Sequence, residues 1–262
     1  MGNRASVKSD TDLQAGLARA REVLARSPRV AAFSGAGLSA ESGLSTFRDP
    51  DPDALWSRFD PTELASLAGF EANPERVIEW YRWRRGSHAS VQPNAAHRAL
   101  AAQPRMIQIT QNVDHLLEQA GADSERVYHL HGSILHDRCH RAACGYRERI
   151  DPDDPPGMRR CPECSAPMRP AVVWFGESLP WDTWARAQKL CTELDCLLVI
   201  GTSATVYPAA GLIELARQCR SRIIVVDPNP GEAGDSADVY LAANAGDVLP
   251  RLLEGFDLSS LD

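Results

Sequence analysis

The sequence lacks several features that would place it in a specialised class of protein. No apolar run approaches the roughly 18 residues of a membrane span, and residues 1–12 mix both charge signs without the apolar stretch of a signal peptide. Bases are outnumbered, with 28 Lys and Arg against 35 Asp and Glu, and only Lys8 and Lys189 are lysines. Non-specific binding of nucleic acid needs a clustered basic excess. We therefore expect a cytoplasmic protein that binds neither nucleic acid nor membranes.

Disulfides are also not required by a chain of this size. Its 262 residues are 44% hydrophobic, 24% charged and 6% aromatic, which is ordinary globular composition and enough for a buried core. The cysteine count of seven is odd, and four of the cysteines fall in two close pairs. This pattern favours metal ligation in a reducing compartment over a disulfide framework.

Short apolar segments alternate with helical patterns along the chain. Leucines at helical spacing predict a helix over residues 10–27, and Asn73 followed by Pro74 predicts a second helix that runs to about His88. Strands are predicted at 29–33, 106–110, 197–200 and 222–226. Such alternation indicates an α/β fold with a parallel sheet and crossover helices.

A small-residue turn follows the first predicted strand. Glycines there allow a tight turn and a close approach of backbone amides to a pyrophosphate, although a bare Gly-x-Gly is often only structural. The wider run GAGLSAESGLSTFR, residues 35–48, resembles the first signature of the sirtuins, which are NAD-dependent protein lysine deacylases. Ser45 stands where that family usually has proline. The resemblance implies cofactor contacts from Gly35, Ala36, Gly37, Glu41, Phe47 and Arg48.

Polar side chains follow the predicted strand 106–110 as Thr-Gln-Asn-Val-Asp. Ligands of open α/β sheets bind at the carboxyl ends of strands, and amide and carboxylate groups there can hold a ribose and a carboxamide. Simple capping of a following helix is the alternative interpretation. The segment is similar to the second sirtuin signature, which implies nicotinamide and ribose contacts from Gln111, Asn112 and Asp114.

Two histidines occur in the run His129-Leu130-His131-Gly132-Ser133. We expect at most one of the two to enter a given pocket. Histidine titrates near neutral pH and is a natural general base. The resemblance selects His131, and we expect His129 to pack or hydrogen-bond on the other face.

The two close cysteine pairs lie in residues 137–170, a segment with too little apolar content for a core. Four thiolates at this spacing can form a closed, structural zinc site, one per chain, that would order the segment. A redox-active Cys-x-x-Cys is the alternative, and His140 could replace one ligand. The predicted ligands are Cys139, Cys144, Cys161 and Cys164. The remaining cysteines, Cys191, Cys196 and Cys219, are predicted to be buried and inert.

Four further segments resemble sirtuin binding regions. Turn residues after the last two predicted strands, and the backbone near Ala245, resemble those that contact the adenosine half of NAD, although turn chemistry alone could explain them. The segment 172–177 resembles an exposed edge that pairs with an extended substrate peptide, an arrangement that reads backbone and favours broad substrate choice. The residues implied are Gly201, Thr202, Ser203, Asn229 and Ala245 for the cofactor, and Val173 and Phe175 for the substrate.

The helix that begins near Pro74 places Val77, Tyr81 and Arg84 on one face, which we expect to be buried. A buried arginine needs an anionic partner, and an internal carboxylate is one possibility. Tyr81 and Arg84, with Ala65 upstream, resemble the sirtuin class that prefers succinyl and malonyl groups. In such a site a guanidinium beside a phenol binds a carboxylate.

The resemblance spans roughly residues 30–250 and implies an α/β fold: a Rossmann-like parallel sheet with a smaller zinc-binding and helical module. We predict a discontinuous NAD-binding domain from residues 1–50, 88–136 and 171–262. The helical insertion 51–87 and the zinc loop 137–170 would form the small domain.

The implied activity is NAD-dependent removal of succinyl, malonyl or acetyl groups from acylated lysines of protein or peptide substrates. Its products are nicotinamide, O-acyl-ADP-ribose and free lysine. An NAD glycohydrolase, an ADP-ribosyltransferase or a non-catalytic NAD-binding protein are the alternatives. Release of nicotinamide without an acyl peptide, or no consumption of NAD, would distinguish them.

Overall fold

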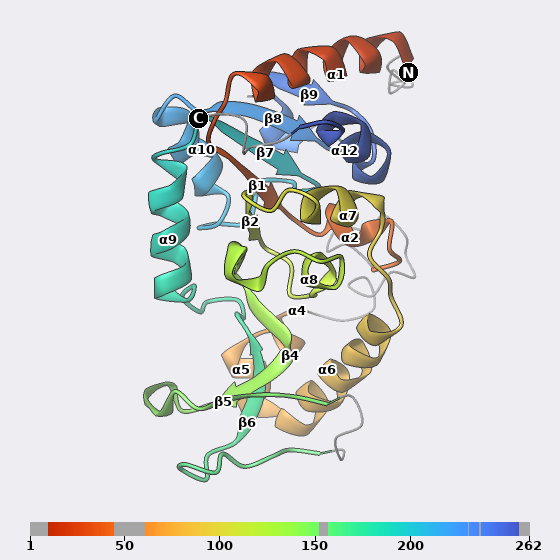
Figure 1. The fold of residues 1–262 in the computed structure, drawn as a ribbon. Coiled ribbons are helices and arrows are strands. Elements are labelled where there is room, and N and C mark those ends of the chain that lie inside the picture. The colour runs from red at the N-terminus through yellow and green to blue at the C-terminus, as the bar shows by residue number, and fades with distance from the viewer. Residues whose placement is uncertain (1–9, 45–60, 152–156, 230, 236, 257–262) are drawn as a thin grey trace, which may run out of the picture.

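The computed structural model describes residues 10–44, 61–151, 157–229, 231–235 and 237–256. A six-stranded parallel sheet forms the upper part of the molecule in Figure 1, and a three-stranded antiparallel sheet forms the lower part. No helix within the described ranges is long and apolar enough to cross a membrane.

The parallel sheet has the strand order β3-β2-β1-β7-β8-β9. Its strands are β1 (Val30–Ser34), β2 (Ile107–Thr110), β3 (Val127–His129), β7 (Cys196–Ile200), β8 (Arg222–Val226) and β9 (Val239–Leu241). From β1 the chain passes to β2 on one side, whereas β7 pairs with β1 on the other. Between β1 and β7 the strand order reverses, and such switch points are where open α/β sheets bind ligands.

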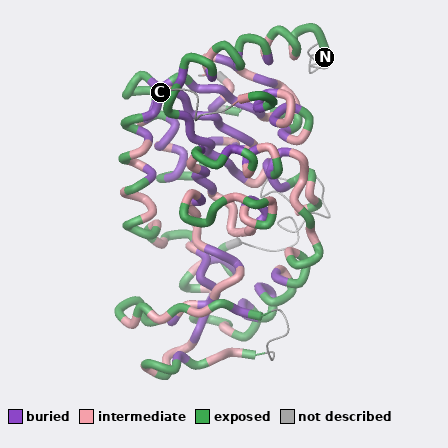
Figure 2. The backbone as a smooth tube through the Cα atoms, viewed as in Figure 1, coloured by how far each residue is buried: buried purple, intermediate pink, exposed green. Residues whose placement is uncertain are grey.

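Both faces of the parallel sheet are covered by helices, so its central strands are continuous apolar runs. Cys196, Leu198 and Ile200 of β7 belong to one hydrophobic cluster, whereas Leu197 and Val199 belong to the other. The helices packed on the first face are α1 (Asp10–Ala25), α7 (Ala95–Ala101) and α12 (Ala245–Leu253). Those on the second are α9 (Trp181–Cys191), α10 (Gly211–Gln218) and α11 (Gly231–Asp235). Buried backbone follows these central strands in Figure 2.

The antiparallel sheet has the order β5-β4-β6. Its strands are β4 (Gly132–Cys139), β5 (Arg147–Arg149) and β6 (Met168–Val172), and helices α4 (Pro61–Leu64), α5 (Leu67–Ala72) and α6 (Pro74–Ala89) pack beside it. The shorter elements near the sheet edges are α2 (Gly37–Ala40), α8 (Leu116–Gln119), η1 (Ser124–Arg126) and η2 (Ala142–Cys144). β4 runs across the predicted boundary between residues 136 and 137, so this sheet begins immediately after His131.

Helix α6 begins as the sequence predicts. The Asn73 side chain accepts a hydrogen bond from the amide of Arg76, and Pro74 occupies the first turn. Near its other end Arg85 fixes the helix to β4. Its Nε donates to the Ile134 carbonyl at 2.6 Å, and its Nη2 lies 2.6 Å from the Asp137 carboxylate. Both side chains are under 10% exposed, so this is a buried ion pair.

Candidate functional site

The predicted cofactor residues that the structure describes gather at the carboxyl ends of the parallel strands. Gly35–Gly37 follow β1, Gln111–Asp114 follow β2, Gly201–Ser203 follow β7, and Asn229 follows β8, while Ala245 begins α12. Phe47 and Arg48, like Ser45, lie outside the described residues. Segments far apart in the sequence therefore meet at one edge of the sheet, on both sides of the switch point.

The glycines after β1 and β7 allow two strand ends to pack backbone against backbone. The amide of Gly35 donates to the Ile200 carbonyl at 3.0 Å, and that of Gly37 donates to the Gly201 carbonyl at 2.8 Å. Gly201 has φ +56°, and a Cβ there would lie 2.4 Å from the Leu38 amide nitrogen. These two amides thus hold the turn itself.

The loop after β2 is fixed by side-chain hydrogen bonds to the segment after β7 and to helix α2. Gln111 donates to the Thr202 hydroxyl at 3.0 Å. The Asn112 amide donates to Ser39 Oγ, and that hydroxyl donates to the Asp114 carboxylate, each at 3.0 Å. Burial raises the pKa of Asp114, although its hydrogen bonds oppose the shift. The loop is thus a preformed set of amide, hydroxyl and carboxylate groups, which are the hydrogen-bond donors and acceptors that a ribose and a carboxamide require.

His131 lies between this loop and β4. Its Nδ1 is 2.9 Å from the Gln111 carbonyl, which only accepts, so Nδ1 carries the hydrogen and Nε2 keeps the lone pair. Gly132 follows with φ +77°, and a Cβ there would lie 2.1 Å from the Ala171 carbonyl oxygen. Burial lowers the pKa of His131, against the effect of the Gln111 hydrogen bond. A neutral imidazole with a fixed tautomer is suited to accept a proton.

His129 points to different partners, as predicted. Its Nδ1 is 3.0 Å from the Asn112 carbonyl, and its Nε2 is 2.8 Å from Oε1 of Glu118. Burial alone would lower the pKa of His129, but the hydrogen bond and charge of Glu118 outweigh burial and raise it. His129 therefore supports the loop after β2 through its contact with the Asn112 carbonyl.

Ala245 and Asn229, which are predicted to contact the adenosine half of NAD, lie at separate points of the same edge. The Glu41 carboxylate accepts from the Gly246 amide at 2.7 Å, which joins the segment after α2 to the start of α12 beside Ala245. The amide of Asn229 donates to Asp227 at 2.8 Å, and the residue is exposed. Its side chain is therefore accessible to a ligand.

The four predicted zinc ligands come together beside the antiparallel sheet. Sγ of Cys139 lies 3.4 Å from that of Cys164, and Sγ of Cys144 lies 3.6 Å from that of Cys161. All four sulfurs are within 4.8 Å of one another. Four thiolates about 2.3 Å from a tetrahedral zinc ion would be roughly 3.8 Å apart, so the cluster fits zinc. These separations are far longer than a disulfide bond, and all four cysteines are free.

Two of the three predicted acyl-reading residues share one hydrophobic cluster, and Arg84 lies beside it. Ala65 and Tyr81 are buried in it, and the Tyr81 hydroxyl accepts from Nε1 of Trp174 at 2.9 Å. The guanidinium carbon of Arg84 lies 5.6 Å from the centre of the Tyr81 ring, and burial lowers the pKa of Arg84 while Tyr81 and Asp114 oppose the shift. Arg84 is only half-buried, so the expected burial of this face is correct for Val77 and Tyr81 and only partly so for Arg84.

The segment predicted to pair with a substrate peptide has its amides engaged within the protein. Val173 donates to the His131 carbonyl and Phe175 to the Ala65 carbonyl, each at 2.9 Å. The amide of Trp174 donates to the Glu177 carboxylate at 2.9 Å. This segment therefore joins β4 to the helical insertion instead of offering free amides, although the Phe175 side chain is 51% exposed.

Comparisons with known proteins decide the family. The sequence model of the Sir2 family matches residues 35–208. The NAD-dependent protein deacylase of Mycobacterium tuberculosis strain H37Rv is 46% identical over 232 residues, which cover 86% of this chain and 97% of that protein. The chain belongs to the Sir2, or sirtuin, family.

Other relatives support the sirtuin assignment over a similar share of the chain. NAD-dependent protein deacylase 1 of Pseudomonas aeruginosa is 44% identical over 244 residues, covering 88% of this chain and 96% of that protein. A solved Sir2 homologue in complex with NAD superposes with a TM-score of 0.82 at 37% identity, covering all of this chain and 98% of the other. A Sir2 homologue bound to ADP-ribose gives a TM-score of 0.84 at 39% identity, covering 90% and 94%.

Several contacts of this sirtuin were not predicted from its sequence. Arg169 is fully buried, lies 4.0 Å above the Trp174 ring and is paired with Glu177, which also binds Arg138. Arg169 stands outside any recognisable motif, so only the tertiary contact identifies it. Cys219 is exposed, so the prediction of its burial is wrong because it ends α10 at the surface, whereas Cys191 and Cys196 are buried.

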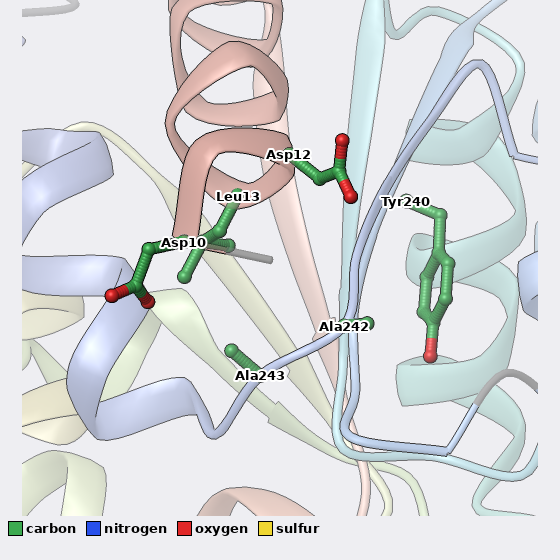
Figure 3. Close-up of a pocket in the computed structure, with 6 residues that line it drawn as sticks. All are labelled: Asp10, Asp12, Leu13, Tyr240, Ala242 and Ala243. Carbon is green, nitrogen blue, oxygen red and sulfur yellow. The ribbon is translucent and has the colours of Figure 1, made fainter. Parts of the chain in front are cut away.

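A surface cavity lies between α1 and β9, and none of its lining residues is a predicted site residue of this sirtuin. Figure 3 shows its lining by Asp10, Asp12, Leu13, Tyr240, Ala242 and Ala243. None of these residues belongs to the strand ends that carry the cofactor motifs. Concavity alone therefore does not locate the site in the described structure.

Proposed function

We propose that this chain removes acyl groups from lysine side chains of proteins in a reaction that consumes NAD. The observation that carries the proposal is the placement of His131. Its Nδ1 is held by the Gln111 carbonyl, and its Nε2 remains the basic atom at the edge where the cofactor motifs gather. The sirtuin relatives named as NAD-dependent protein deacylases support the same reaction.

The strand ends supply the cofactor-binding groups. Gln111, Asn112 and Asp114 present amide and carboxylate groups to the nicotinamide and its ribose, and residues after β7 and β8 contact the adenosine half. NAD, when bound, supplies the ADP-ribosyl group that accepts the acyl group as nicotinamide leaves. The expected products are nicotinamide, O-acyl-ADP-ribose and free lysine.

His131 acts as the general base. It accepts a proton from a ribose hydroxyl of NAD at Nε2 while Nδ1 keeps its hydrogen bond to Gln111, so the ring does not have to reorient. Burial favours its neutral form, the form that can accept a proton. The four-cysteine cluster has no open position and holds zinc for a structural purpose only.

The same proposal includes a preference for succinyl and malonyl groups over acetyl. Tyr81 and Arg84 lie side by side on α6 as a phenol and a guanidinium, and the small side chain of Ala65 belongs to the same cluster as Tyr81. A guanidinium can bind a carboxylate through two parallel hydrogen bonds. Acetyl-lysine still fits because it is smaller.

The test measures loss of the acyl group from one peptide carrying succinyl-, malonyl- or acetyl-lysine, with and without NAD, by mass spectrometry. We expect deacylation only with NAD, and faster on the two acidic acyl groups. Nicotinamide release in a control without peptide would indicate an NAD glycohydrolase instead. Deacylation that proceeds without NAD would overturn the proposal.

A further inference from the structure

Three side chains next to the loop after β2 bring metal-ligand atoms together. Glu118 lies in α8, His115 directly precedes that helix, and His129 ends β3. Oε1 of Glu118 is 3.1 Å from Nδ1 of His115 and 2.8 Å from Nε2 of His129. All three ligand atoms lie within 4.8 Å of one another, in a cluster separate from the four cysteines.

Both imidazole rings are oriented by their other nitrogen. Nδ1 of His129 is 3.0 Å from the Asn112 carbonyl, and Nε2 of His115 is 2.7 Å from the Ser133 hydroxyl. Histidines that bind metals commonly donate their second ring hydrogen to such an acceptor, which fixes the tautomer and the ring. The remaining nitrogens of both rings therefore point at the same carboxylate.

The Glu118 carboxylate has unused capacity. Its Oε1 faces both histidines, whereas Oε2 is buried and has no hydrogen-bond partner among the residues that the structure describes. A buried carboxylate oxygen without a partner is unfavourable, and a bound cation would compensate it.

We propose that His115, Glu118 and His129 bind a divalent transition-metal ion of the Zn²⁺ class, at a second site in addition to the four cysteines. Two imidazoles and one carboxylate are a common ligand set for such ions. Ligand atoms about 2.0–2.1 Å from a tetrahedral ion are roughly 3.3 Å apart, so the present distances of 2.8 and 3.1 Å need to open only slightly. The side chains are 15% to 19% exposed, which leaves access for the ion and for water as a further ligand.

The bound ion would connect α8 to β3 next to the loop after β2, which is predicted to contact nicotinamide. Metal binding would release to solvent the proton that Nε2 of His129 donates to Glu118, and His129 would bind the ion through that nitrogen while keeping its Nδ1 bond to the Asn112 carbonyl. The metal would therefore stiffen the support of Asn112 without occupying the position of His131.

The test uses full-length protein whose cysteine site already holds one zinc per chain. Co²⁺ is added and followed by equilibrium dialysis and by visible absorption, because cobalt bound by imidazole and carboxylate lacks the thiolate charge-transfer band of a cysteine site. We expect about one additional Co²⁺ per chain, and at least tenfold weaker binding in His115→Ala. The matched control is His136→Ala, which removes a neighbouring histidine outside the ligand set and should bind within twofold of the wild type.

Three outcomes would overturn the proposal. The wild type could bind no additional Co²⁺, the His136→Ala control could lose binding as strongly as His115→Ala, or the new absorption could carry the thiolate band. Each variant must retain one zinc per chain and the wild-type thermal transition. Should His115→Ala not fold, Glu118→Gln, which keeps the side-chain shape, replaces it, and undiminished binding by that variant would equally refute the site.

Discussion

Replacement of Arg84 by methionine tests the acyl preference. The guanidinium carbon of Arg84 lies 4.9 Å from the centre of the Trp80 ring. Methionine keeps much of the apolar stem of the arginine beside Trp80 and Tyr81 but removes the charge. A hydrogen bond to a charged group contributes about 1.5–3 kcal/mol. The same energy lost from the transition state lowers kcat/KM roughly 10- to 150-fold.

The assay measures kcat/KM on one peptide carrying either succinyl- or acetyl-lysine. We expect that loss on the succinyl peptide and less than about a threefold change on the acetyl peptide, since only the succinyl group ends in a carboxylate. Arg82→Met is the matched control, because Arg82 is an exposed arginine of the same helix, and both activities should persist. An equal fall on both peptides in Arg84→Met would refute a carboxylate-reading role.

Four further changes test other parts of the account. His131→Ala should lower turnover at least 100-fold while NAD affinity, measured by calorimetry, changes little, and retained turnover would remove His131 from the mechanism. Burial lowers the pKa of His131, so its neutral form persists as pH falls and the acidic limb of the kcat/KM profile should lie below pH 6.5, whereas a limb above that value would contradict the burial argument. Asp137→Asn should destabilise the fold by about 3–5 kcal/mol in urea unfolding because Arg85 stays buried without its counter-charge, and a loss below about 1 kcal/mol would show that the pair is not structurally important. Chelation of zinc should make residues 137–170 sensitive to protease, and fresh protein with much less than about one zinc per chain would count against the four-thiolate site.

The four central strands of the parallel sheet were predictable because they carry their own signal, whereas the edge strands β3 and β9 were not predicted. β8 begins and ends at the predicted residues, and β1 is displaced by one residue. A strand buried on both faces reads as a continuous apolar run, so its limits are set by local composition. The zinc ligands were equally predictable, because their spacing in the sequence indicates a metal site without knowledge of the surrounding fold.

The supporting contacts of the site were not predictable, because they depend on which elements pack together. Arg84 and Arg85 are consecutive residues of α6, and only the position of Asp137 on β4 decides that Arg85 forms the buried ion pair. Spacing also gave no sign that the amides of Val173 and Phe175 would bond to His131 and Ala65. Such tertiary contacts override what a pattern indicates locally.

The most direct measurement of the central claim follows nicotinamide and free lysine together in one reaction that contains NAD and an acyl-lysine peptide. If His131 serves a site that couples the two substrates, both products should appear at equal rates and neither should form when either substrate is omitted. Nicotinamide produced in excess of free lysine, or free lysine produced without nicotinamide, would contradict the account.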